Sequence, residues 1–117
     1  MINDYTHFAE EWIDSWNAHD LDRIMSHYRD DCEITTPMIK TALGIDTGTL
    51  AGKSAVRNYW RAALDKVPDL HFELIDITAS VNSVALYYQS ISNKKAIEVM
   101  FFDKSGKVSK GFAHYSE

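Results

Sequence analysis

The sequence predicts an α+β fold in which helices come first and an antiparallel sheet follows. Before Pro68, three segments carry apolar residues every three to four positions, the spacing of helices that bury one face. After Pro68, four strand-like segments alternate with short polar turns. This segregation indicates an α+β fold, because a βαβ fold would alternate helices and strands along the chain.

Length and composition indicate one globular domain spanning residues 1–117. The chain is 45% hydrophobic and 25% charged, a balance that excludes intrinsic disorder. No apolar run approaches the ~20 residues that cross a bilayer, and the first residues do not resemble a signal peptide. The single cysteine, Cys32, excludes an internal disulfide and suits a reducing compartment, so we expect a cytoplasmic protein. The net charge of the chain is −5. The negative charge argues against nucleic acid and membrane as partners.

Two helices are expected in the first 28 residues. Asn3 or Asp4 can cap the first, whose apolar face comprises Tyr5, Phe8, Ala9, Trp12, Ile13 and Trp16. Asn17, Ala18 and His19 end it. Asp20 can then cap a shorter helix, whose inner face comprises Leu21, Ile24, Met25 and Tyr28.

The next segment is expected to contain a turn, a short strand and a loop. Residues 29–31 form the turn, and the strand covers residues 32–36 because Pro37 interrupts strand pairing. Residues 38–51 have no clean period, so we interpret them as a loop, with one helical turn as the alternative. A loop of this length could act as a lid.

A third helix is expected between Gly52 and Pro68. Its inner face comprises Val56, Tyr59, Trp60, Ala63, Leu64 and Val67. The strands that follow are expected at residues 70–79, 81–91, 96–103 and 108–116, with hairpin turns between them.

Both faces of the strand at residues 96–102 are mainly apolar, which predicts that both are covered. The helices can cover one face of a four- or five-stranded sheet. We therefore expect a homodimer through the outer face, involving Val99, Phe101, Phe112 and His114. The alternative is a monomer with a few exposed apolar residues, as many proteins have.

The sequence contains no glycine-rich phosphate loop, CxxC, HExxH or GxSxG motif, so we expect neither a cofactor nor a metal. His7 and Glu11 are interpreted as a solvated helical pair, and His71 and Glu73 as a surface pair on a strand. Cys32 is expected to be a small buried residue.

Glu98 is the most informative polar residue, because only apolar residues surround it in the sequence. If it is buried, it must be paired or protonated, since an isolated buried carboxylate costs several kcal/mol. An apolar cavity would raise its pKa and make it a hydrogen-bond donor or proton shuttle. The alternative is an open position where Glu98 faces water or a lysine.

Five strings follow one another over nearly the whole chain, at residues 12–22, 28–37, 52–60, 98–108 and 113–117. In this order they resemble the nuclear transport factor 2-like superfamily, in its SnoaL-like and ketosteroid isomerase-like branch. The resemblance implies a cone-shaped roll: a strongly curved antiparallel sheet packed with three N-terminal helices around a cavity. It implies less about activity, because one fold hosts many functions.

The resemblance also assigns residues to the cavity. Thr36 matches the aspartate that serves as the isomerases' general base, and a threonine cannot accept that proton. Trp12 and Trp60 match two tyrosines of the oxyanion hole, and Glu98 matches its protonated aspartic acid. The cavity walls implied in this way are Trp12, Trp16, Thr36, Trp60, Met100 and Tyr115.

We therefore expect a protein that binds a small apolar ligand, with Glu98 as a polar anchor. One alternative is an isomerase- or cyclase-type enzyme for a small carbonyl or polyketide-like compound, with Glu98 as the catalytic proton donor or shuttle. The other is a non-catalytic dimeric interaction module. A second titratable group within hydrogen-bond reach of Glu98 would favour catalysis, and a filled cavity would favour the interaction module.

Overall fold

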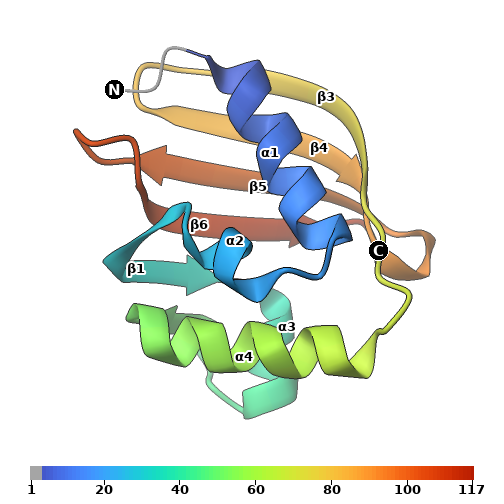
Figure 1. The fold of residues 1–117 in the computed structure, drawn as a ribbon. Helices are drawn as coiled ribbons and strands as arrows, with labels where there is room; N and C mark the ends of the chain where they lie inside the picture. The colour runs from blue at the N-terminus through green and yellow to red at the C-terminus, as the bar shows by residue number, and fades with distance from the viewer. Residues whose placement is uncertain (1–3) are drawn as a thin grey trace.

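A computed structural model, which describes residues 4–117, confirms the α+β fold (Figure 1). Six strands form one curved, unclosed sheet in the order β2-β1-β6-β5-β4-β3. The elements are α1 (Tyr5–Asn17), α2 (Leu21–Met25), β1 (Tyr28–Thr35), α3 (Pro37–Leu43), β2 (Thr49–Ala51), α4 (Lys53–Lys66), β3 (Glu73–Ala79), β4 (Ser83–Gln89), the 3-10 turn η1 (Ile91–Asn93), β5 (Lys95–Phe102) and β6 (Val108–Tyr115).

The first two helices begin at predicted caps. The Asp4 carboxylate accepts a hydrogen bond from the His7 backbone N–H at 2.8 Å, while Asn3, the other candidate, lies outside the described residues. The Asp20 carboxylate accepts one from the Arg23 N–H at 3.1 Å. Each bond satisfies a backbone donor that the first helical turn leaves open. Between the helices, His19 takes a positive φ of 54°, which changes the direction of the chain.

The first strand differs from its prediction. Tyr28, expected on the inner face of the second helix, begins β1, and residues 29–31 belong to this strand instead of forming a turn. β1 pairs in parallel with β6, and the register shifts between Tyr28 and Glu33. The sheet is therefore mixed, whereas we expected it to be antiparallel. The residues at 29–31 are charged and exposed, so they lack the apolar pattern that predicts a strand. The partner strand also lies about 80 residues away in sequence.

The segment interpreted as a loop contains a helix and a strand. Pro37 occupies the first turn of α3, where its missing N–H costs nothing, and the Thr36 hydroxyl caps the helix by accepting from the Met38 N–H at 3.2 Å. Gly44 ends α3 in the left-handed conformation that favours glycine. β2 then pairs with β1 and adds an edge to the sheet, which gives six strands where four or five were expected.

The third predicted helix and the four later strands are confirmed; all are shorter than predicted except β5, which is shifted by one residue. α4 begins directly after Gly52, and the strands β3 to β6 form successive antiparallel pairs. In Figure 1, α1 crosses the face of the sheet near β3 and β4, and α4 lies at the opposite end, beside β1. None of the helices within residues 4–117 is long and apolar enough to cross a membrane.

The two faces of β5 have different surroundings. Ala96, Glu98, Met100 and Phe102 are buried on the helix-covered side. On the other side, Ile97 and Phe101 are each 42% exposed. The alternation thus confirms the predicted faces of this strand and directs Glu98 inward.

Candidate functional site

Glu98 lies in the middle of the sheet, on its inner face. β5 pairs with β4 and β6, so that Leu86 and Ala113 are the cross-strand neighbours of Glu98. The residue is only 5% exposed. A carboxyl group in this position has lost nearly all its contact with bulk water, which strongly disfavours its ionised form.

One hydrogen bond compensates in part for this burial. The Tyr88 hydroxyl on β4 donates to Glu98 Oε1 at 3.2 Å. Burial raises the pKa of Glu98 to about 7, although the Tyr88 hydrogen bond opposes this shift. Glu98 can therefore gain or lose its proton near neutral pH.

Gly111 provides the space that the carboxyl group occupies. It lies on β6, between Met100 of β5 and Ile34 of β1 in the strand register. A Cβ atom at this position would lie 3.6 Å from Glu98 Oε2 and 3.2 Å from Ile34 Cδ1. Any longer side chain here would displace the Glu98 carboxyl group or the Ile34 side chain.

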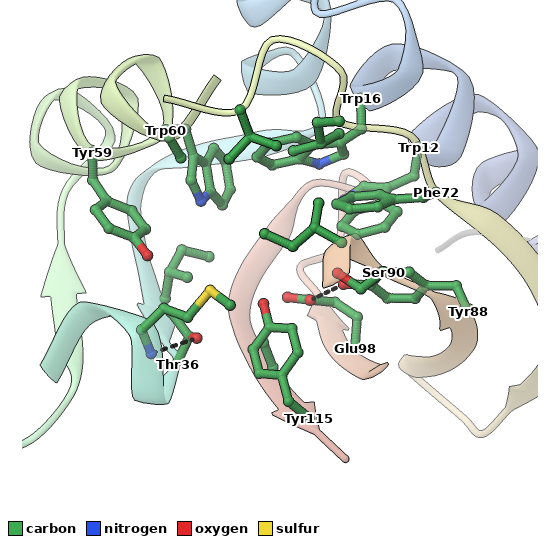
Figure 2. A pocket seen from close by; sticks show the side chains of 17 residues that line it. Trp12, Trp16, Thr36, Tyr59, Trp60, Phe72, Tyr88, Ser90, Glu98 and Tyr115 are labelled. Atoms are coloured by element: carbon green, nitrogen blue, oxygen red, sulfur yellow. Dashed lines mark hydrogen bonds between the residues drawn. The ribbon is translucent and has the colours of Figure 1, made fainter. Parts of the chain in front are cut away.

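A cavity of about 80 Å³ lies next to the carboxyl group, between the sheet and helices α1 and α4 (Figure 2). Since a single water molecule needs about 10–15 Å³ by the same measure, this space suits a molecule of several non-hydrogen atoms. Its lining residues are Trp12, Trp16, Ile34, Thr36, Met38, Tyr59, Trp60, Ala63, Val67, Leu70, Phe72, Tyr88, Ser90, Ile91, Glu98, Ala113 and Tyr115.

The cavity brings together all but one of the residues that the sequence assigned to it. Glu98 and the residues Trp12, Trp16, Thr36, Trp60 and Tyr115 line the wall. Met100 does not, so its prediction as a wall residue is wrong. It is completely buried on the same strand face as Glu98, deeper in the core, where it contacts Tyr28.

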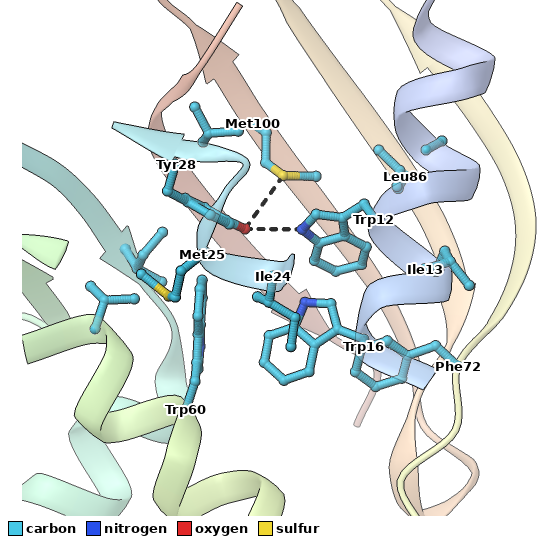
Figure 3. Packing of buried hydrophobic residues seen from close by; sticks show 14 of the residues in the cluster. Trp12, Ile13, Trp16, Ile24, Met25, Tyr28, Trp60, Phe72, Leu86 and Met100 are labelled. Carbon is cyan, nitrogen blue, oxygen red and sulfur yellow. Dashed lines mark hydrogen bonds between the residues drawn. The ribbon is translucent and has the colours of Figure 1, made fainter. Parts of the chain in front are cut away.

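The ring of Trp12 lines the cavity, while its indole N–H bonds within the core. Its indole N–H donates to the Tyr28 hydroxyl at 2.9 Å, and that hydroxyl donates to the Met100 sulfur at 3.7 Å (Figure 3). The indole N–H of Trp12 is thus committed to the core and is not available to Glu98. The buried Trp16 Nε1 has no hydrogen-bond partner among the described residues.

Three tyrosine hydroxyls, from three different strands, lie close enough to Glu98 to feel its charge. Burial, together with the nearby Glu98 carboxylate, raises the pKa of Tyr28 on β1, Tyr88 on β4 and Tyr115 on β6. All three remain protonated at neutral pH. They therefore supply neutral hydroxyl groups, and Glu98 is the group in this cluster that can titrate near pH 7.

Sequence reasoning missed Tyr88, which makes the one hydrogen bond to Glu98 recorded among the described residues. Its signal was present, because Tyr88 continues the inward alternation of Val84 and Leu86 on a predicted strand. Phe72 was also missed, because it was assigned to a strand but precedes β3. Its backbone N–H and C=O both bond to the Asn17 side chain, at 2.7 and 2.9 Å, which holds the ring at the cavity wall.

The other polar candidates lie outside this cavity. Glu11 forms an ion pair with Arg23 at 2.6 Å, with His27 nearby at 3.6 Å, so the expected pairing with His7 is replaced by a closer partner. Cys32 is fully buried, as predicted.

Comparisons with known proteins agree with this architecture. Residues 9–107 match the model of the SnoaL-like domain family. A SnoaL-like protein of unknown function from Burkholderia thailandensis is 48% identical, with a TM-score of 0.94; the match covers 96% of this chain and 93% of that one. No protein with a curated description matches the sequence.

More distant structures share the fold at low identity. A proposed isomerase of the SnoaL-like family from Agrobacterium tumefaciens has a TM-score of 0.78 at 14% identity, with coverage of 99% of this chain and 100% of that one. A proposed ketosteroid isomerase from Kribbella flavida has a TM-score of 0.69 at 15% identity, with coverage of 95% and 76%.

Replacing Tyr28 by Phe should destabilise the protein by about 1–3 kcal/mol, because the buried Trp12 N–H would lose its acceptor. Urea denaturation of the variant measures this loss. Tyr87→Phe, on the half-buried outer side of β4, is the matched control and should change the free energy of unfolding little. Equal effects of the two substitutions would contradict the importance of the Trp12–Tyr28 bond.

Glu98 should make the protein less stable as the pH rises from about 4.5 to about 7. The unfolded carboxyl group ionises near 4.5, whereas the folded one ionises near 7, so deprotonation favours unfolding across this interval. At 1.36 kcal/mol per pKa unit, the loss is roughly 3 kcal/mol. This loss of stability is absent below the pKa of Glu98 in the unfolded state and complete above its pKa in the folded state.

Urea denaturation across this pH range, with Glu98→Gln as the comparison, tests this prediction. The variant cannot ionise at position 98, so its stability relative to the original protein should increase with pH. His27, whose pKa burial lowers, titrates in the same range but is present in both proteins and cancels from the difference. A difference that does not change with pH would contradict the assigned environment of Glu98.

Proposed function

The chain belongs to the SnoaL-like family, and we propose that it binds a small, mainly apolar molecule in the cavity, with Glu98 as its polar anchor. The observation that carries this proposal is a carboxyl group buried in a largely aromatic wall beside open space. Binding sites of this kind combine apolar walls with a few polar groups that orient the ligand.

The positions around Glu98 support a binding site over a filled core. Gly111 leaves room for the carboxyl group, and Tyr88 holds one of its oxygens. Burying a carboxyl group reduces stability, and an apolar residue at position 98 would avoid this cost. A ligand that hydrogen-bonds to Glu98 would explain why a carboxyl group is buried here in spite of this cost.

A proton-transfer enzyme of the isomerase or cyclase type is the second candidate. Two observations favour it: Tyr88 is a titratable group within hydrogen-bond reach of Glu98, and the pKa of Glu98 is raised to about 7. Such a pKa suits general acid or base catalysis at neutral pH. In this case Glu98 is the group that donates or accepts the proton, while Thr36, whose hydroxyl caps α3, takes no part as a base.

Small neutral ligands should quench or shift the intrinsic fluorescence, because all three tryptophans of the chain line the cavity. Acetone, tert-butanol and cyclopentanone are suitable probes of this size. Glu98→Leu should weaken their binding about tenfold or more by removing the hydrogen-bonding group. Glu33→Leu makes the same change at an exposed strand position and should leave affinity unaltered. Absence of a saturable signal with every probe would contradict the binding proposal.

We also propose that the outer face of β5 and β6 pairs two copies of the chain. Phe101 is 42% exposed and contacts Phe112 edge-on, with ring centroids 6.1 Å apart. Val99 and Phe112 are half-buried, and His114 is exposed at the margin of the same face. An apolar strip of this kind along two adjacent strands is suited to association with a copy of itself.

Light scattering should therefore show a dimer at micromolar concentration and a monomer for Phe101→Lys, because the new charge would be buried at the centre of the interface. Val81→Lys places the same charge at an exposed apolar residue in the β3–β4 turn and should leave the dimer intact. A monomeric original protein, or dimers of equal stability in both variants, would contradict this interface.

A further inference from the structure

Within the described residues 4–117, the cavity wall carries one group that can become negative near neutral pH and none that can become positive there. The 17 lining residues from this part of the chain include seven aromatic side chains and Glu98, but no lysine, arginine or histidine. The aromatic residues are Trp12, Trp16, Tyr59, Trp60, Phe72, Tyr88 and Tyr115. Figure 2 shows the carboxyl group directed toward the space that these rings surround.

The surface beside the cavity has the same sign of charge. An open hollow shares Val67, Ser90 and Ile91 with the cavity, and it adds the exposed carboxylates of Asp69 and Glu73. Among residues 4–117, no lysine or arginine lines this hollow, and His71 is its one basic side chain. Carboxylates beside the cavity raise the local concentration of cations and repel anions.

We propose that the cavity takes a small alkylammonium cation, held by the Glu98 carboxylate and by the surrounding aromatic rings. This inference rests on the proposed binding function and names the chemical class of its ligand. Aromatic rings attract organic cations through the negative potential of their faces, and this attraction is greatest where water is excluded. An adjacent buried carboxylate adds the opposite full charge.

The groups around Glu98 are compatible with this ligand. The hydroxyls of Tyr28, Tyr88 and Tyr115 remain protonated, so they neither neutralise the cation nor add a second charge. Tyr88 donates to Oε1, and Oε2 has no hydrogen bond within residues 4–117, so it can accept from an ammonium N–H. When Glu98 is protonated, binding of the cation releases that proton to solvent, so charge is conserved within the site.

A pair of ligands with the same shape tests the proposal. tert-Butylammonium and tert-butanol each have five non-hydrogen atoms and differ in charge. Tryptophan fluorescence titrations at pH 5.5 and pH 8.5 give the affinity of each. Because the pKa of Glu98 is about 7, the affinity of the cation should increase about tenfold or more between these pH values, whereas that of tert-butanol should not increase.

The substitution Glu98→Gln should abolish both the preference for the cation and its pH dependence, while tert-butanol still binds. Glu33→Gln removes one exposed charge from β1 and should leave both unchanged. Equal or tighter binding of tert-butanol at both pH values would overturn the inference and leave the proposed binding function standing. Failure of both ligands to bind would overturn the inference together with a binding site of this size.

Discussion

The burial of Glu98 is the constraint on which the site depends. The carboxyl group occupies the centre of the inner sheet face and is 5% exposed, with a tyrosine hydroxyl as its neighbour and no cation in the cavity wall. Desolvation therefore outweighs the single hydrogen bond and raises the pKa to about 7. Gly111 on the next strand is part of the same arrangement, because a Cβ there would contact the carboxyl group at 3.6 Å and crowd Ile34 at 3.2 Å.

The aromatic shell around Glu98 has two kinds of member. Trp12 donates a hydrogen bond to Tyr28, and Tyr28 donates one to Met100. These three side chains therefore hold α1 against β1 and β5. Trp60, Phe72 and Tyr115 complete the wall from α4, the segment before β3, and β6. The indole N–H of Trp12 is thus used within the core. Glu98 supplies the cavity wall with a group that can titrate near neutral pH.

The inward direction of Glu98 could be predicted because alternation along β5 is a local property of the sequence. The same holds for α1 and α4, whose apolar spacing predicted their buried faces. The parallel pairing of β1 with β6 could not be read locally, since its strands are far apart in sequence and residues 29–31 are charged. Met100 was misplaced because alternation gives the face of a strand and not the depth of a side chain along it. The contact between Tyr88 and Glu98 could be predicted only from the pairing of β4 with β5, whose register lets the Tyr88 hydroxyl reach the carboxyl group.

The carboxyl pKa of Glu98 is the quantity that tests this account most directly. NMR titration of protein labelled with ¹³C at the glutamate carboxyl, with Glu98→Gln to assign the resonance, measures it without reference to any ligand. The account predicts a midpoint near 7, well above the 4.5 of an unperturbed glutamate. A midpoint at or below 4.5 would show that Glu98 is solvated or paired with a cation, and would contradict the buried anchor at the centre of the proposed site.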